Sequence, residues 1–544
     1  MAMDNKRDLI DPTGMDFEDL RQLVLSRRRL LQLGAVAAGT SALAAVTVHD
    51  SQAAPNAQAD TPKPGGRLKV LYTNDPDVLD PHLTSSIAAI RVIDLVYESL
   101  LGFGEQQQLV PMLAERWEIP DDKTYIFHLR QGVKFHNGRS LVAEDVKYTY
   151  ERIMNPETGS PQTWYFTAVD QIEVPDPATV KITMKAPFAP FLYALAQPTV
   201  SIVPKEEVEK QGGNLNKQAV GTGPFILKEW VPKTKVTYDK NPEYWMGGKP
   251  YLDGIDVTIQ SDEAVISTSI RAKSTDFVDY VPPKDFDNLK NMKGLTLIEF
   301  TGTDWEYLGL NTLKKPFDDK RVRQAIAWTV NVDDIVKNAY FGHATKLTCG
   351  PLPSWSWAHC PDAVYPAPDL EKAKALLAES GYPDGFKMTI TMGRPAPTYN
   401  AAAEVTKAAL KQIGIDAEIE GMEWGTWVDK VINQKDFEST ITGWHSFIDP
   451  DQYLYPQFHT GEFWNWYSYS NPEVDKLLEE GRTTLDQERR KEIYLQLQRM
   501  LAEEAVYIFY TNDNVLKAHF DYVKGYQAPP SATNLFFRET WLDR

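Results

Sequence analysis

The chain has 544 residues, a formal net charge of −18 at pH 7, and 42% hydrophobic and 11% aromatic residues. This length exceeds what one hydrophobic core usually supports, so we expect two or more lobes. The acidic charge argues against nucleic acids and anionic membrane surfaces as partners. The 14 tryptophans suit a ligand cleft that uses flat side chains.

The first 59 residues have the pattern of an export signal. Ser26-Arg27-Arg28-Arg29-Leu30-Leu31 precedes a modestly apolar run from Leu33 to Val48, and small residues follow up to Ala59. The pattern predicts a twin-arginine signal peptide and a periplasmic location. An uncleaved membrane anchor is the alternative, although the run is short for a membrane span. Because no cysteine precedes Cys349, we expect no lipid anchor and a freely diffusing protein. We also expect it to be a monomer.

The folded part is expected to begin with a strand from Arg67 to Tyr72. A loop containing Asn74 and Asp75 follows, and the spacing from Ile87 to Leu101 predicts a helix. In the segment 112–153, Tyr125 to Leu129 alternates as a strand does. Turn residues and a helical repeat follow it, so this segment is predicted to be strand, hairpin and helix.

The second half of the chain alternates between predicted helices and strands. Trp305 to Leu310 alternates as a strand before this region begins. The expected helices are 319–330, 369–380, 401–413, 424–433, 472–480 and 487–504, and the strands are 386–391, 415–420, 437–443 and 506–511. Such alternation indicates a largely parallel, helix-covered α/β sheet.

Several motifs resemble one protein family. The segment 112–153 contains L-A-E-x-W, then Y-x-F-x-L-R-x-G-V-K-F-H-x-G, then A-E-D-V, and is similar to the signature of the family 5 extracellular solute-binding proteins. These are the oligopeptide- and dipeptide-binding receptors of ABC importers. Further similar motifs, in family order, are Gly221 to Phe225, Asn241 to Trp245, Leu310 to Thr312, Pro316 to Ile326, and Gly443-Trp444 with Asp449-Pro450.

The resemblance implies a two-lobed α/β periplasmic binding protein of class II (cluster C), with an extra small subdomain in lobe I and a hinge. We expect lobe I at 60–305, with the subdomain at about 105–218, lobe II at 306–507, and a return to lobe I at 508–544. It also implies an inner-membrane ABC permease as partner, a small-molecule or short-peptide ligand, and no cofactor.

The predicted ligand contacts follow from strand ends and from the resemblance. Ligands of open α/β sheets lie beyond the carboxyl ends of the strands, which directs attention to the loop after strand 437–443. The resemblance also implies cleft positions in the loop before Leu79-Asp80-Pro81, for which an ordinary turn is the alternative. The expected ligand-binding residues are Asn74, Asp75, Trp305, Tyr307, Trp424, Gly443, Trp444, His445 and Asp449. Core packing is the alternative for the aromatic residues.

Two departures from the peptide-binding pattern bear on the ligand. Phe447 and Ile441 stand where the relatives' partners for a peptide's amino and carboxyl ends are expected. We therefore expect a small polar or cationic solute held by aromatic faces and Asp449, with a free peptide as the alternative.

Cys349 and Cys360 are the only cysteines, and they flank a loop rich in proline and tryptophan. An oxidising compartment favours a disulfide between them. A metal site using His359 and Cys360 is the alternative, but one such pair supplies too few ligands.

The alternative class of function is an enzyme, namely a periplasmic hydrolase exported by the twin-arginine route. The sequence contains no G-x-S-x-G, H-E-x-x-H, C-x-x-C, P-loop or G-x-G-x-x-G motif. A glycosidase would need a carboxylate pair such as Asp449 and Asp451, but adjacent acids in a loop are common. The sequence favours binding without catalysis.

Overall fold

The computed structural model describes residues 61–544 except 105–106, 394–396, 445–447 and 530–534. The predicted signal peptide, His445 and Phe447 lie outside the described residues. Among the helices that it does describe, none is long and apolar enough to cross a membrane.

One large sheet connects most of the strands. Its order is β15-β14-β16-β12-β17-β11-β1-β10-β9-β8, and β13 pairs with β17. In chain order these strands are β1 Arg67–Tyr72, β8 Phe225–Val231, β9 Lys235–Lys240, β10 Gly254–Ile259, β11 Phe277–Val278, β12 Leu295–Leu310, β13 Ala344–Lys346, β14 Lys387–Met392, β15 Asp416–Gly421, β16 Ser439–Trp444 and β17 Tyr507–Phe520.

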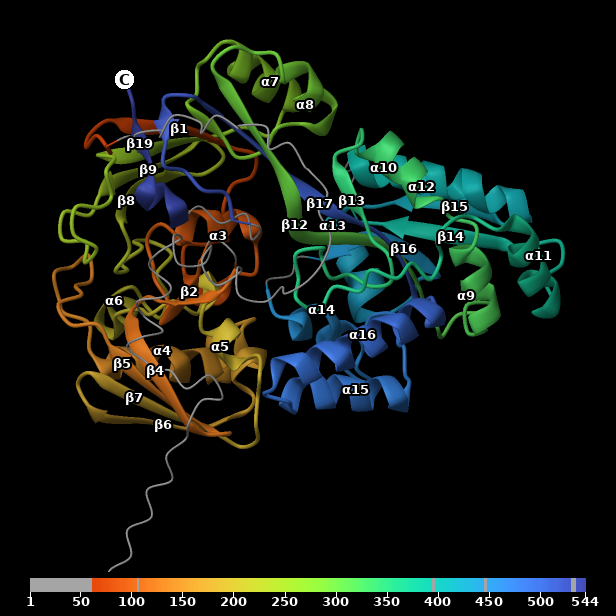
Figure 1. The fold of residues 1–544 in the computed structure, drawn as a ribbon, viewed down its shortest axis with the longest axis horizontal. Coiled ribbons are helices and arrows are strands. Elements are labelled where there is room, and N and C mark those ends of the chain that lie inside the picture. Colours follow the sequence, from red (N-terminus) through yellow and green to blue (C-terminus); the bar gives the residue numbers. More distant parts are fainter. Residues whose placement is uncertain (1–60, 105–106, 394–396, 445–447, 530–534) are drawn as a thin grey trace, which may run out of the picture. The chain divides into compact units, whose positions relative to one another are not determined.

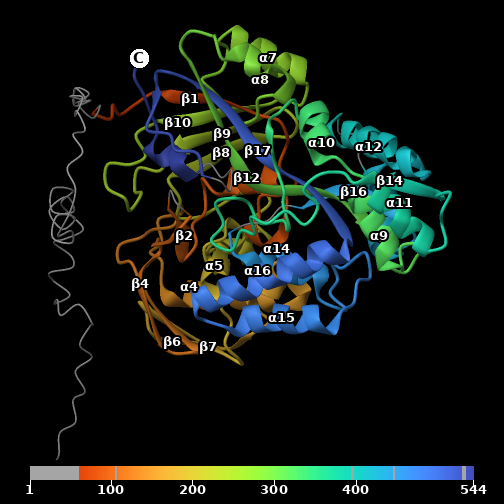
Figure 2. The same cartoon turned by 45° about the vertical axis from the view of Figure 1, so that its right-hand side comes forward.

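Two long antiparallel strands form the middle of this sheet. β12 pairs with β17 along most of its length, and Figures 1 and 2 show them side by side, in green and blue. β17 pairs with β11 of the predicted lobe I, and β12 pairs with β16 of the predicted lobe II. The predicted lobe boundaries at 305/306 and 507/508 fall on these two strands.

A separate four-stranded antiparallel sheet lies within the predicted subdomain. Its order is β4-β5-β7-β6, and α4 packs on it (Figure 1). Alternate residues of β5 and β7 point into a core with Val146 and Tyr150 of α4, which explains the helical spacing in the sequence. The bounds are β4 Ala114–Asp121, β5 Thr124–Leu129, β6 Val169–Asp176, β7 Thr179–Met184 and α4 Ala143–Met154.

The lobe II strands are only partly parallel. β15, β14 and β16 run parallel, as the sequence predicted, whereas β12 runs antiparallel to both of its neighbours, β16 and β17. The helices here are α9 Lys320–Ala327, α10 Val332–Ala339, α11 Leu370–Glu379, α12 Pro397–Leu410, α13 Trp424–Trp427 with a π-helical turn at Val428–Asn433, α14 Pro450–Phe458, α15 Pro472–Thr483 and α16 Gln487–Glu504.

The remaining α-helices and strands fall within the predicted lobe I. They are α3 Ile87–Ile93, α5 Phe191–Ala194, α6 Lys205–Lys210, α7 Glu263–Arg271, α8 Pro283–Leu289, β2 Leu101–Phe103, β3 Leu109–Pro111, β18 Val523–Lys524 and β19 Trp541–Leu542. The predicted helix from Ile87 to Leu101 is wrong in its second half. α3 ends at Ile93, and the carbonyls of Leu95 and Val96 accept hydrogen bonds from Phe225 and Gly223. These tertiary contacts replace the helical ones.

Candidate ligand-binding site

Two of the predicted site residues lie at one edge of the lobe II sheet. The parallel strands β15, β14 and β16 end at Gly421, Met392 and Trp444. Trp444 is the last residue of β16, and Trp424 follows the end of β15 by three residues. This carboxyl edge is where ligands of open α/β sheets lie.

Six aromatic rings form a connected group at this edge, which we call the aromatic cluster. Trp424 stacks on Trp427 with ring centres 4.8 Å apart, and Trp444 meets Trp464 edge-on at 5.0 Å. Trp466 lies within 6.1 Å of Trp427, Trp444 and Trp464, and Phe463 adjoins Trp464. Trp424 is 42% exposed and Phe463 is 60% exposed, so the cluster offers accessible ring area at both ends.

Two other predicted aromatics, Trp305 and Tyr307, have the surroundings of core side chains. Both are fully buried in β12, and their rings pack on each other and on Tyr507. Burial raises the pKa of the Tyr307 hydroxyl. The alternation in the sequence could not reveal this, because both faces of β12 are covered here. We leave both residues out of the proposed contacts.

Gly443 is needed for close packing. A Cβ at this position would lie 2.7 Å from the Tyr399 hydroxyl and 3.1 Å from the Trp305 carbonyl oxygen. The glycine therefore lets β16 lie close to β12, and it presents the adjacent Trp444 at the strand end.

Asp449, the predicted partner of a ligand cation, is buried in an ion pair. Its two oxygens accept hydrogen bonds from Arg490 at 2.8 and 2.9 Å, and one oxygen also caps α14 through the Asp451 amide. Asp449 and Arg490 are 0% and 4% exposed at their side chains. Since this carboxylate already has a cation and a helix cap as partners, we leave it out of the proposed ligand contacts.

Asn74 and Asp75 follow β1 in lobe I. Asn74 is exposed and donates to Thr73, while Asp75 accepts a hydrogen bond at 3.0 Å from the indole of Trp230 on β8. Asp75 therefore joins this loop to β8, which is separated from β1 in the sheet by β10 and β9.

A small cavity of about 50 Å³ lies against lobe I. By this measure it has room for a few water molecules or a small ligand group. Its wall combines side chains from the segments 94–103 and 196–201 with Phe536, and Ile448, four residues after Trp444, also lines it. Most of the lining side chains are apolar, and Gln197 is among the polar ones.

Gln197 offers an acceptor in this wall. Its amide nitrogen donates to the Tyr193 carbonyl at 3.2 Å, but its amide oxygen has no hydrogen-bond partner in the described part of the chain. The side chain is buried, so the unpaired oxygen favours a donor in the cavity. Sequence reasoning missed Gln197. The only available signal was one amide in the apolar run 191–200.

Glu98 also lines the cavity, but its hydrogen bonds are structural. Its carboxylate accepts from Thr222, Tyr244 and Trp245 at 2.7 to 2.8 Å. Burial raises the pKa of Glu98, and these donors oppose that shift. The G-T-G-P-F and N-P-E-Y-W motifs therefore meet at one buried carboxylate.

The predicted disulfide is confirmed: Cys349 and Cys360 are bonded, with Cα atoms 5.9 Å apart. Cys360 is therefore not available as a metal ligand, and His359 interacts with the Leu352 carbonyl. Among the described residues, no group of three or more His, Cys, Asp or Glu side chains could hold a metal ion.

Comparison with known proteins decides the family. The sequence profile of the bacterial extracellular solute-binding proteins, family 5 (middle region), matches residues 108–465. The chain belongs to this family. As a family 5 protein it is the solute-binding component of an ABC importer, and its fold is the two-lobed one of these proteins.

Relatives cover nearly the whole folded part. The glutathione-binding protein GsiB of Salmonella typhi is 31% identical over 463 residues, which are 83% of this chain and 90% of GsiB. The solved structure of DppA from Helicobacter pylori in complex with the peptide STSA has a TM-score of 0.79 and 29% identity, over 89% of this chain and 99% of DppA. The structure of the binding protein AgaA from A. tumefaciens R10, in complex with agropinic acid, has a TM-score of 0.78 and 28% identity, over 88% of this chain and 99% of AgaA.

Proposed function

We propose that this protein captures a short peptide or peptide-like solute of about the size of glutathione and delivers it, unaltered, to an ABC permease. The supporting observation is the match of 463 residues to a glutathione-binding protein, together with the fold shared with a peptide-bound receptor. The ligand would contact the aromatic cluster through Trp424 and Trp444 and would donate a hydrogen bond to Gln197. The lobes would close by bending at β12 and β17.

The structure changes which partners are available for charged groups of the ligand. Asp449 is paired with Arg490, so the proposed binding of a cationic group rests on the ring faces alone. A peptide's terminal charges would need partners other than positions 441 and 447, where Ile and Phe stand. A small polar or cationic solute that is not a peptide remains the second candidate.

The proposed export route keeps the twin-arginine signal at 1–59 and a monomeric, periplasmic mature protein without a lipid anchor. Replacing Arg28 and Arg29 by lysine should stop export, so that precursor accumulates in the cytoplasm. Normal export of this variant would contradict the proposed route.

A thermal-shift screen tests the ligand class. The probes are reduced glutathione, the peptide Ser-Thr-Ser-Ala, the dipeptide Met-Leu, a polyamine and a neutral sugar. A ligand at about one hundred times its dissociation constant should stabilise the fold by about 2.7 kcal/mol. Stabilisation by glutathione or a peptide supports the proposal, and stabilisation by the polyamine or sugar alone would replace it with the second candidate.

A further inference from the structure

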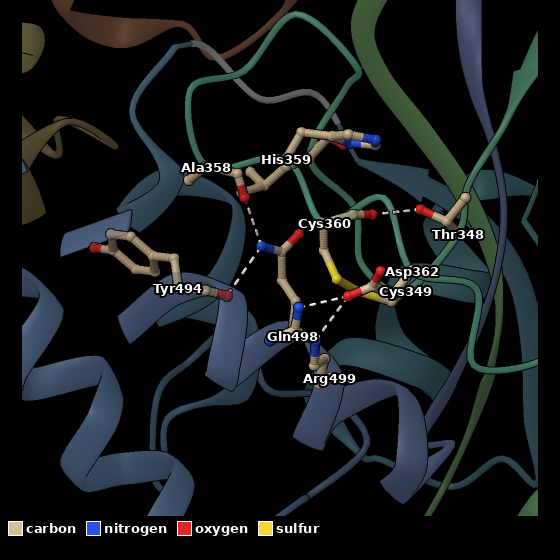
Figure 3. The surroundings of a disulfide bond; sticks show 10 residues. Thr348, Cys349, Ala358, His359, Cys360, Asp362, Tyr494, Gln498 and Arg499 are labelled. Atoms are coloured by element: carbon tan, nitrogen blue, oxygen red, sulfur yellow. Dashed lines mark hydrogen bonds and ion pairs between the residues drawn. A yellow bond between two sulfur atoms is a disulfide. The ribbon is translucent and has the colours of Figure 1, made fainter. Parts of the chain in front are cut away.

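The carboxyl-terminal side of the loop between Cys349 and Cys360 is fixed to α16. The two cysteines and Ala502 of α16 form a small buried apolar cluster. Gln498 of the same helix donates to the Ala358 carbonyl at 2.8 Å and to the Tyr494 carbonyl at 2.9 Å (Figure 3). Figure 3 also shows Arg499 of α16 directed at Asp362, just past the loop. The loop is therefore attached to a long, regular helix.

The other part of the loop reaches the two long strands of the sheet. The indole nitrogen of Trp355 donates to the Thr301 carbonyl of β12 at 2.9 Å. The side-chain amide of Asn512, on β17, donates to the Pro351 carbonyl at 3.1 Å. Asn512 is 1% exposed, so this contact is made in the protein interior.

These contacts coincide with a break in the β12–β17 ladder. Thr301 pairs with Asn514 and the next pair is Trp305 with Asn512, so residues 302–304 on β12 lie opposite Asp513 alone. Such a bulge bends a strand and leaves backbone groups without ladder partners. Thr301 and Asn512 flank the bulge, and the loop binds the carbonyl of one and the side chain of the other.

We infer that the loop from Cys349 to Cys360 is a brace that holds the β12–β17 bulge in one geometry, with Trp355 as its positioning residue. The disulfide joins the two ends of the loop, whose cysteines are 11 positions apart in the sequence, and so limits the conformations open to the residues between them, which include Trp355. The brace connects α16 to the strands that the two lobes share. Its effect on lobe closure rests on the proposed function, but its existence does not.

Amide hydrogen exchange of the mature protein, without ligand, tests the brace. Trp355→Phe keeps a large ring but removes the indole N–H. It should speed exchange at 301–304 and 512–514 by about two- to tenfold, as expected for the loss of one hydrogen bond from a local opening. The double variant Cys349→Ala/Cys360→Ala should speed exchange in the same segments and in 349–360.

Trp357→Phe is the matched control. It lies in the same loop, but its indole nitrogen has no hydrogen-bond partner in the described structure, so exchange at the bulge should not change. Unchanged exchange at 301–304 and 512–514 in Trp355→Phe would overturn the inference. A uniform rise over the whole folded chain would also overturn it, because that result reports general destabilisation. If the cysteine variant does not fold, the comparison of Trp355→Phe with Trp357→Phe still shows whether the loop holds the bulge.

Discussion

Asp80 and Arg152, 72 residues apart, form a buried ion pair in lobe I. The guanidinium donates to the two Asp80 oxygens at 3.1 and 2.7 Å and also to the ring of His82. Arg152 lies in the segment 112–153, which resembles the family signature, and Asp80 lies in Leu79-Asp80-Pro81. Their contacts hold α4 of the subdomain against the turn after β1, so these motif residues are part of the scaffold rather than the ligand site.

His82 should make the fold sensitive to acid. Burial lowers its pKa to about 4, whereas an unfolded histidine titrates near 6.5. The fold therefore favours the neutral His82 ring, and its full contribution to stability is present above about pH 6.5. As the pH falls from 6.5 to 4 this contribution is lost, which lowers the free energy of unfolding by about 3 kcal/mol in total. The free energy of unfolding, measured with urea at pH 7.5 and at pH 4.5, should differ less between the two pH values in His82→Gln than in the wild type.

Burial also lowers the pKa of His136 to about 4, so His82→Gln should reduce the acid sensitivity without abolishing it. Equal pH dependence in His82→Gln and the wild type would contradict the assignment to His82.

Trp424 should contribute directly to ligand affinity. Trp424→Ala removes a ring at the accessible end of the aromatic cluster and should weaken binding of the ligand found by thermal shift by about tenfold, measured by calorimetry. Phe341→Ala, another exposed aromatic of lobe II outside the cluster, is the control and should bind as tightly as the wild type. A Trp424→Ala protein with wild-type affinity would remove the aromatic cluster from the site.

At the scale of elements, periodicity and end signals predicted most of the chain. β1 and α16 have the predicted bounds, and Asp486, just before the predicted helix, caps α16 through the Arg489 amide. The error at Ile87–Leu101 arose because Glu98 points inward to a buried network of Thr222, Tyr244 and Trp245, which local periodicity does not encode.

The start of α14 should depend on Asp449 for stability rather than for ligand binding. Asp449→Asn keeps an oxygen to cap the helix, but it leaves the buried guanidinium of Arg490 without its anion. The free energy of unfolding should therefore fall by on the order of 3 kcal/mol. Urea unfolding measures this loss, and the affinity for the ligand should not change.

Asp486→Asn is the matched control. Asp486 also caps a helix, but it is exposed, and asparagine caps about as well as aspartate, so stability should change by less than about 0.5 kcal/mol. An Asp449→Asn protein of normal stability that no longer binds a cationic ligand would return Asp449 to the site.

At the scale of the whole molecule, the family motifs predicted the fold class and the solute-binding role, but only part of the candidate site. Trp424 and Trp444 could be predicted because the family resemblance implies pocket positions there, and Trp444 also lies at a strand end. The burial of Trp305 and Tyr307, the Asp449–Arg490 pair and the unpaired oxygen of Gln197 could not, since each depends on residues distant in the chain.

The protein is proposed to bind a peptide-like solute and to release it unaltered. Native mass spectrometry of the mature protein with reduced glutathione, Ser-Thr-Ser-Ala and Met-Leu tests this most directly. We predict a monomer carrying one ligand, which has the mass of the intact probe after denaturation. Absence of any adduct at saturating probe, or the accumulation of hydrolysed probe, would contradict the account.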